Sequence, residues 1–372
     1  MTDDHIIRPA LNHIPADIVC LRDYERAALG FMREDIQAYV NGGAADEITV
    51  RDNAQAFSKL RLINRVFGDF SAASTRTTIA GIELASPLLL APVAHQRLLH
   101  AQGEVATAQA AAAMNVPMIV STLSSMPLEQ IAAQLDHWWF QLYWQPARDA
   151  NELLLKRAHA AGARAIVITL DAPVSGVRNR AQRAGFRLPE GVLEANLLGL
   201  PKAAPVALQE NDSVVFQHFM RQRPGIDELR WLRAHTELPL IAKGISHPDD
   251  AVLLKELGFN GVIISNHGGR TLDTLPPSID SLPAIRAAVG QDFAILFDSG
   301  IRRGTDIVKA LALGANAVCV GRPQLWALAV AGPLGVAHML RILQEELEMA
   351  MAFCGTPTPA DIGGHCLQNP PL

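Results

Sequence analysis

The sequence lacks several features that would assign it to common functional classes. Its 372 residues contain no long lysine- or arginine-rich run and carry a formal net charge of −5, which argues against a nucleic-acid partner. The four cysteines have no C-x-x-C spacing, so we expect neither a disulfide framework nor a zinc site, and no other metal. Because no secretory h-region and no run of about 18 apolar residues occurs, we expect a soluble cytoplasmic protein without a membrane partner.

What the chain does contain is eight short apolar runs, each followed by polar residues or glycine. The runs do not alternate with polar residues, which is typical of strands buried on both faces of a parallel sheet. Stretches of about 12–18 residues with helix-forming composition separate most of them. The sequence therefore predicts an α/β fold, a (β/α)8 TIM barrel, with strands at 88–91, 118–120, 138–142, 165–170, 238–242, 261–264, 294–297 and 317–320.

We expect residues 1–372 to form a single domain whose barrel core spans 85–330. Residues 1–80 are predicted to be an N-terminal helical extension, in which helical spacing over 24–40 ends at Asn41-Gly42-Gly43.

Residues 325–372 should supply C-terminal helices and a tail. One or two helices are predicted over 325–354, and the Pro-rich tail is expected to be only partly ordered. A long gap separates the fourth and fifth strands, and we interpret residues 173–222 as an inserted lid. An irregular surface excursion is the alternative.

The loops after the last two strands predict an anion site. Residues 298–304 read Asp-Ser-Gly-Ile-Arg-Arg-Gly, and residues 321–323 read Gly-Arg-Pro. Glycines let backbone amides approach an anion, and arginines neutralise it with forked donors. Because barrels frequently bind phosphate at these two loops, we expect a phosphorylated substrate or cofactor. Ordinary turn glycines with surface arginines are the alternative.

The loops after the fourth, fifth and sixth strands carry groups that can move protons or hold charge. His267, followed by two glycines at a strand end, would face the barrel mouth and accept a proton, with Arg270 placed to hold a carboxylate. Asp171 could pair with this histidine or cap a turn. Lys243 could form a Schiff base, hold a phosphate or stabilise an anionic cofactor. The alternative for His267 is a purely structural role.

Taken together, these motifs resemble those of the FMN-dependent α-hydroxy-acid oxidising family, which includes glycolate oxidase, lactate oxidase and mandelate dehydrogenase. The resemblance runs from about residue 17 to 354, and its strongest motif is Ser265-Asn266-His267-Gly268-Gly269-Arg270. It implies oxidation of an (S)-2-hydroxy acid to the 2-oxo acid with FMN, while O2 is reduced to H2O2. It also implies a homotetramer or octamer.

The resemblance gives individual residues a role in substrate binding and chemistry. His267 resembles the base that attacks the substrate, and Asp171 resembles its carboxylate partner. The residues that match those contacting the substrate or holding its carboxylate are Tyr39, Tyr143, Arg178 and Arg270.

Other positions match the cofactor site of the family. Lys243 resembles the residue near flavin N1 and O2, where its charge would stabilise the reduced ring. The positions expected to line FMN are Pro92, Val93, Ala94, Ser121, Gln141, Thr169 and Ser265. Those expected at its ribityl and phosphate end are Asp298, Gly300, Arg302, Gly321 and Arg322.

Two departures concern the substrate pocket. His95 stands where glycolate oxidases carry methionine, and Leu123 stands where plant-type glycolate oxidases have tryptophan. The smaller Leu123 leaves room, so we expect a 2-hydroxy acid larger than glycolate. Ala94 favours an oxidase, since mandelate dehydrogenase has glycine at this position.

Three rival functions remain. A dehydrogenase that passes electrons to a membrane quinone or another acceptor would need a membrane-binding segment, and residues 192–208 are only mildly apolar. An FMN barrel isomerase acting on a phosphorylated substrate would not need Arg178 with Arg270. A flavin-binding barrel without activity would need neither the base nor its carboxylate.

Overall fold

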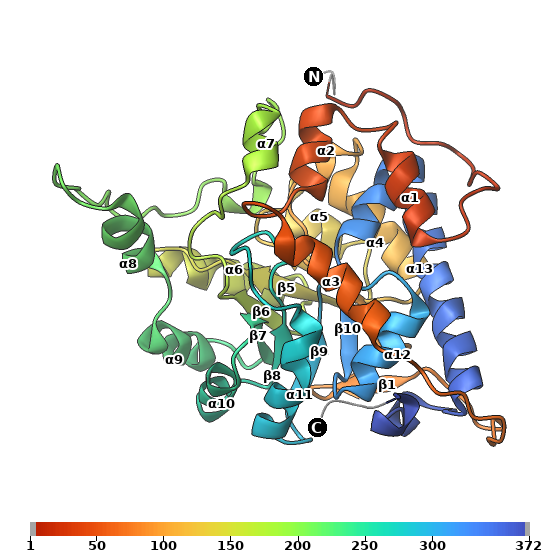
Figure 1. Ribbon diagram of the computed structural model, residues 1–372. Coiled ribbons are helices and arrows are strands. Elements are labelled where there is room, and N and C mark those ends of the chain that lie inside the picture. Colours follow the sequence, from red (N-terminus) through yellow and green to blue (C-terminus); the bar gives the residue numbers. More distant parts are fainter. Residues whose placement is uncertain (1–4, 369–372) are drawn as a thin grey trace.

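Eight parallel strands form a closed barrel at the centre of the molecule, as the computed structural model of residues 5–368 shows (Figure 1). The order around the barrel is β10-β3-β4-β5-β6-β7-β8-β9. All eight predicted strands are confirmed, and four have the predicted ends. The strands are β3 (Leu88–Leu90), β4 (Met118–Ser121), β5 (Trp138–Leu142), β6 (Ile166–Thr169), β7 (Leu240–Ile245), β8 (Gly261–Ile264), β9 (Ala294–Phe297) and β10 (Ala317–Val320).

The strands separate two layers of hydrophobic core. Leu89, Ile119 and Trp139 belong to a cluster inside the barrel, whereas their neighbours Leu88, Leu90 and Val120 belong to the larger cluster shared with the helices. Both faces are therefore buried, which explains why the strands read as continuous apolar runs. A hairpin of β1 (Thr77–Ile79) and β2 (Ile82–Leu84), not predicted from the sequence, packs against the inner cluster.

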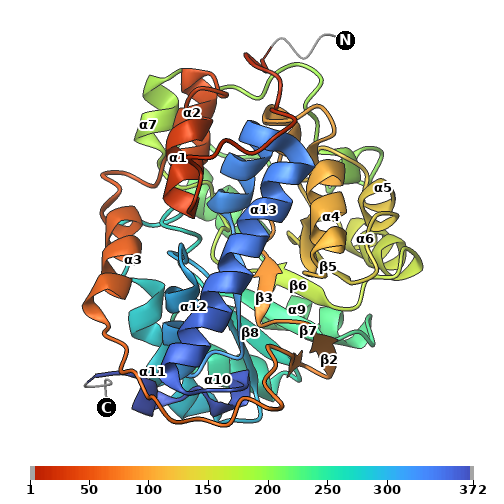
Figure 2. The same ribbon diagram turned by 90° about the vertical axis from the view of Figure 1, so that its right-hand side faces the viewer.

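Helices surround the barrel on the outside, and most follow a strand directly along the chain. They are α4 (Gly103–Ala113), α5 (Leu128–Ala132), α6 (Arg148–Ala160), α9 (Ile226–Ala234), α10 (Pro248–Glu256), α11 (Ser278–Val289), α12 (Gly304–Ala312) and α13 (Arg322–Cys354). Figure 2 shows α13 running the length of the barrel beside α4 and α12. It is long and apolar enough to cross a membrane, but most of its apolar part is buried inside the protein, as in a core helix.

The C-terminal part of the chain agrees with prediction in its helices but not in its tail. The α13 backbone leaves helical geometry at Ala331 and Gly332, so two helices meet at a kink, within the predicted one or two. The tail is better ordered than expected, because Cys366 and Leu367 are buried and Leu367 pairs with Leu62. Residues 369–372 lie outside the described part of the chain.

The N-terminal segment contains three helices, α1 (Leu21–Ala28), α2 (Glu34–Asn41) and α3 (Ile48–Lys59). The prediction of one helix over 24–40 was wrong, because the chain leaves the helix at Leu29-Gly30 and re-enters it at Glu34. The predicted stop at Asn41-Gly42 is confirmed. The later helix α3 had not been predicted.

The insertion after β6 contains short elements that the sequence analysis did not predict. They are α7 (Asn179–Arg183), the 3-10 turn Ala195–Leu197, the π-helical turn Val214–Phe219 and α8 (Met220–Gln222). Figure 1 shows α7 beside α2 at the top of the molecule, while the chain leading to α8 projects away from the barrel. The insertion thus has an inner half near the barrel mouth and an outer half that protrudes.

Candidate active site

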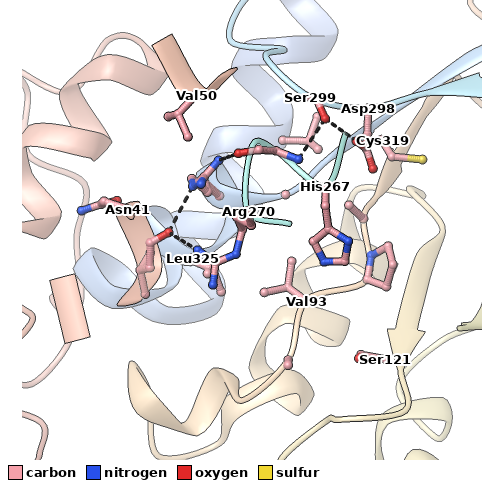
Figure 3. A pocket seen from close by; sticks show the side chains of 18 of the residues that line it. Asn41, Val50, Val93, Ser121, His267, Arg270, Asp298, Ser299, Cys319 and Leu325 are labelled. Atoms are coloured by element: carbon pink, nitrogen blue, oxygen red, sulfur yellow. Dashed lines mark hydrogen bonds between the residues drawn. The ribbon is translucent and has the colours of Figure 1, made fainter. Parts of the chain in front are cut away.

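A cavity opens at the carboxyl ends of the barrel strands and collects most of the predicted site residues (Figure 3). The predicted residues that line it are Tyr39, Pro92, Val93, Ala94, Ser121, Tyr143, Arg178, Lys243, His267, Arg270, Asp298, Gly300, Arg302, Gly321 and Arg322. Four other predicted residues lie behind this lining: Asp171, Gln141 and Ser265 bond to residues that form it, and Thr169 bonds to Gln141. Segments far apart in the sequence therefore meet at one site.

His267 and Asp171 form a partly buried pair just after β8 and β6. The His267 Nδ1 atom lies 3.0 Å from Oδ1 of Asp171. Gly244 in β7 makes this approach possible, since its φ is +95° and a Cβ there would lie 2.3 Å from the Asp171 carboxyl carbon. The pair therefore requires glycine, a residue without a Cβ, at position 244 of the neighbouring strand.

The electrostatics of this pair suit a base. Burial lowers the pKa of His267, against the opposing effect of Asp171, so the imidazole is neutral at pH 7 and able to accept a proton. Burial opposes ionisation of Asp171, but the charges of His267 and Lys243 hold its pKa below the usual value. A carboxylate beside a neutral imidazole stabilises the imidazolium that forms when the base takes a proton.

Lys243 occupies the floor of the cavity as a buried cation. Its Nζ donates to Ser265 Oγ at 3.1 Å and lies 3.4 Å from Oδ2 of Asp298. Although burial favours the neutral amine, Asp298 and Asp171 raise the pKa of Lys243 above its usual value. A Schiff base requires a neutral amine, so this geometry favours the electrostatic role among the three that the sequence left open.

Two guanidinium groups flank the ring of Tyr39. The Cζ atoms of Arg270 and Arg178 lie 5.1 Å and 5.7 Å from the ring centroid, and Phe186 stacks on the ring at 4.2 Å. Burial and the charge of Arg178 lower the pKa of Arg270 to about 10. Within residues 5–368, the buried Nε of Arg178 has no hydrogen-bond partner. Two close cations with an unused donor form a site for a small anion such as a carboxylate.

A polar ladder crosses three neighbouring strands beside this anion site. Ser121 Oγ donates to Gln141 Oε1 at 3.0 Å, and Gln141 Nε2 donates to Thr169 Oγ1 at 3.0 Å. Ser121 lines the cavity, so its hydroxyl reaches the surface that a planar ring would occupy. Burial raises the pKa of the nearby Tyr143 to about 12, so its hydroxyl stays protonated at pH 7 and can donate a hydrogen bond.

The far end of the cavity fits a phosphate. Arg322 donates only to carbonyl oxygens, and burial with neighbouring arginines lowers its pKa well below the usual value. Arg302 is likewise buried with a lowered pKa, and neither guanidinium forms a salt bridge to any residue between 5 and 368. A Cβ on Gly300 would lie 2.6 Å from the Asn53 carbonyl oxygen, so only glycine fits at this position. Helix α13 begins at Arg322, at the same end of the cavity. Two guanidinium groups without a carboxylate partner, one of them at a helix N-terminus, fit an anion of the phosphate type.

Sequence reasoning missed residues outside the barrel. Asn53 on α3 exchanges hydrogen bonds of 2.9 and 2.8 Å with Asn266, and this anchors the loop that carries His267 at a φ of +57°. Phe186 and Glu194 of the insertion were not expected at the site either. The motif around Asn266 was the available signal that this loop is anchored, but Asn53, which anchors it, lies more than 200 residues earlier in the chain.

Comparison with known proteins agrees with this geometry. Residues 30–369 match the family model described as FMN-dependent dehydrogenase. The chain is 49% identical to an L-lactate oxidase of Alicycliphilus denitrificans over 94% of this chain and 96% of the relative. It is 42% identical to a 4-hydroxymandelate oxidase of Amycolatopsis orientalis over 91% and 94% of the two chains. The structure of a mandelate oxidase with benzoyl-formic acid matches with a TM-score of 0.84 at 40% identity, covering 94% and 98%.

These matches cover nearly the whole chain. FMN as cofactor, 2-hydroxy acids as substrates and O2 as electron acceptor, all predicted from the resemblance, are thereby confirmed. The chain belongs to the family of FMN-dependent 2-hydroxy-acid oxidases.

Proposed function

We propose that this oxidase acts on (S)-2-hydroxy acids and that its own residues divide the work between recognition and proton transfer. Arg178 and Arg270 bind the substrate carboxylate, with the hydroxyls of Tyr39 and Tyr143 as further donors. His267, oriented by Asp171, accepts the proton. The observation that carries this proposal is the neutral His267 imidazole, which is bonded to the Asp171 carboxylate and lines the same cavity as the two guanidinium groups.

The proposed reaction follows from these positions. Holding the carboxylate at two cations fixes the α-carbon in front of His267, which removes orientational freedom before the reaction begins. His267 then takes a proton from the substrate, from either the hydroxyl or the α-carbon. FMN, when bound, would supply the acceptor for the two electrons and the second proton of the substrate, and O2 would take these together with the proton held by His267 to give H2O2. The imidazolium is stabilised by Asp171, because its Oδ1 lies 3.0 Å from Nδ1.

The residues for FMN follow from the same cavity. We propose that Lys243 supplies a positive charge beside the ring, and that Arg302 and Arg322 bind the phosphate. The ring would be lined by Pro92, Val93, Ala94, Ser121, Gln141, Thr169 and Ser265, and the ribityl and phosphate end by Asp298, Gly300 and Gly321. Loss of FMN from the double variant Arg302→Met/Arg322→Met, measured as the flavin-to-protein ratio, tests the phosphate assignment.

We propose a substrate larger than glycolate. Leu123 lines both the main cavity and an adjoining one, which also contains Trp144 and Phe219 and shares His267 and Arg178 with the main cavity. The space beyond Leu123 supports a side chain larger than that of glycolate. The ratio of kcat/KM for lactate and mandelate to that for glycolate tests this proposal, and the Leu123→Trp variant should shift the ratio toward glycolate.

We also propose that the insertion 173–222 covers the bound substrate and that the chain forms a homotetramer or octamer in the cytoplasm. Phe67 and Phe353 support self-association, because they are 87% and 72% exposed and lie on segments joined by the Arg65 N–H to Phe353 carbonyl bond. Exposed aromatic rings of this kind are common at interfaces. Light scattering after size exclusion measures the subunit count directly.

The proposed activity is tested by mixing the purified flavoprotein anaerobically with a panel of 2-hydroxy acids and following flavin absorbance. Bleaching by the S enantiomer, followed by rapid recovery and peroxide when O2 enters, is the expected result. Sluggish recovery would indicate a dehydrogenase with another acceptor. A flavin that no 2-hydroxy acid bleaches would overturn the proposed substrate class.

A further inference from the structure

His95 lies between the substrate-facing Tyr39 and a carboxylate of the insertion. Its Nδ1 is 3.4 Å from the Tyr39 hydroxyl oxygen, and its Nε2 is 3.5 Å from Oε1 of Glu194. The histidine is only 8% exposed and lines the main cavity. The three side chains therefore form a row that starts at the protein surface and ends at the carboxylate-binding site.

The insertion holds Glu194 firmly at this place. The next residue, Ala195, donates its N–H to the Ser124 carbonyl oxygen at 3.0 Å. Asn196 is fully buried, and its side chain accepts from the Leu128 N–H and donates to the Ser121 carbonyl oxygen. The contact with His95 lowers the pKa of the Glu194 carboxyl, which is therefore an anion at pH 7. A fixed anion thus faces the imidazole from the side opposite Tyr39.

The protonation state of His95 decides what the Tyr39 hydroxyl can do. A neutral imidazole that carries its proton on Nε2, facing Glu194, presents a bare Nδ1, which accepts the hydroxyl proton of Tyr39 and turns it away from the substrate. A doubly protonated imidazole donates from Nδ1 to the hydroxyl oxygen, which leaves the hydroxyl proton free to bond a carboxylate. Only the second state lets Tyr39 donate to an anionic substrate.

We propose that His95 is a positioning residue that takes up one proton when a 2-hydroxy-acid anion binds, and so orients the Tyr39 hydroxyl toward the carboxylate. This inference rests on the proposed substrate site. The bound anion and Glu194 both favour the imidazolium, whereas Arg178 and Arg270 on the Tyr39 ring oppose it in the free protein.

Other titratable groups near this row are few. Below the loop that carries His95, the Glu104 carboxylate accepts from the Gln96 and Ser125 N–H groups. His267 lines the same cavity and also becomes cationic in acid, so anion binding is linked to its proton as well. The test must therefore separate the two histidines.

The experiment is isothermal titration of the flavin-loaded protein with two 2-oxo acids, pyruvate and benzoylformate, in buffers of different ionisation enthalpy between pH 5.5 and 8.5. The dependence of the heat on the buffer gives the number of protons taken up per anion. We expect uptake approaching one proton in the upper half of this range, with Kd rising toward tenfold per pH unit. In this upper half the variant His267→Gln should keep the uptake, because the lowered pKa of His267 confines its own protonation to more acidic conditions, and His95→Gln should lose it.

Two glutamate variants complete the test. Glu194→Gln should move proton uptake to lower pH and weaken binding at pH 7, because the imidazolium loses its anionic neighbour. Glu190→Gln, at an exposed glutamate of the same segment, should behave as wild type. Circular dichroism and the flavin-to-protein ratio verify that each variant is folded and loaded.

The outcomes separate this inference from the proposed function. Anion binding with undiminished proton uptake in His95→Gln would overturn the role of His95, and loss of uptake in His267→Gln alone would assign the proton to the base. Binding without proton uptake in the wild type would also overturn it, while leaving the substrate site intact. Failure of both acids to bind the loaded wild type would instead overturn the proposed site, and this inference with it.

Discussion

The proposed base and two of the four residues proposed to bind the substrate, Tyr39 and Arg178, belong to two differently built parts of the molecule. Asp171 and His267 directly follow the barrel strands β6 and β8, whose neighbours fix their register. Tyr39 and Arg178 belong to α2 and to the inner half of the insertion, which hold each other through the Ala45 N–H to Val177 carbonyl bond. Strand pairing therefore places the chemistry, and contacts between two segments outside the barrel place the recognition.

This difference predicts how the effects of substitutions divide. A change at the barrel pair should appear in kcat, because it alters groups that act in the transition state. A change in the segments outside the barrel should appear mainly in KM, because it alters binding that substrate and transition state share. The five predictions below test that division, from the largest expected effect to the smallest.

His267→Gln should lower kcat by about 10²–10⁴-fold, the usual contribution of a general base, while FMN stays bound. Glutamine keeps the size and polarity of the site but cannot accept a proton at this position. Steady-state kinetics and the flavin-to-protein ratio measure both results. An unchanged kcat would remove His267 from the mechanism and contradict the assignment of the reaction to the barrel residues.

Asp171→Asn should lower kcat by about 10–100-fold, the loss expected when a hydrogen bond to a charged group is removed. The variant should also shift the pH dependence of kcat/KM, which a simple loss of activity would not do. Asp171 raises the pKa of His267 while burial lowers it, so the variant has a base that stays neutral to a lower pH. The acid limb of the kcat/KM profile should therefore move to lower pH, and movement to higher pH would contradict the assignment.

Arg178→Met should raise KM by about 10–100-fold, because the substrate carboxylate loses one of two charged donors. The change in kcat should be smaller than the change in KM. Arg183→Met provides the matched control, since Arg183 lies on the same segment and is exposed. A variant with a lowered kcat and an unchanged KM would mean that Arg178 acts in the chemical step rather than in substrate binding.

Phe186→Ala should raise KM by about 2–10-fold, the range expected for loss of one aromatic stacking contact. The ring of Phe186 lies almost parallel to that of Tyr39, with an interplanar angle of 12°. Leu188→Ala removes a more exposed apolar side chain from the same stretch and should have no such effect. Equal effects of the two substitutions would mean that the stacking contact does not position Tyr39.

Replacing residues 202–208 with a Gly/Ser linker of equal length should change kcat/KM by less than about twofold, as for other surface substitutions. These residues belong to the outer half of the insertion and are mostly exposed. Stopped-flow reduction of the flavin measures the effect on the first half-reaction alone. A loss beyond tenfold would show that the outer half also closes over the substrate.

The success of the sequence predictions depended on how local each signal was. The eight strands were found because each is a short run buried on both faces, and such a run is apolar without reference to its neighbours. His267 and Asp171 were placed together because the carboxyl ends of all barrel strands meet at one face. By contrast, α3 was missed and a single helix over 24–40 was wrong, since these short helices are stabilised by packing on the barrel rather than by their own pattern.

The sequence by itself determined the barrel, an anion site at its mouth and the residues that meet there, because strand burial and loop motifs are encoded within a few neighbouring residues; the family resemblance of those motifs then identified FMN. Only the tertiary structure decided that Phe186 stacks on Tyr39, that Asn53 anchors the loop of His267, and that His95 joins Tyr39 to Glu194. Each of these contacts joins residues far apart in the chain. Their formation depends on how segments outside the barrel pack on one another, and no local periodicity records that packing.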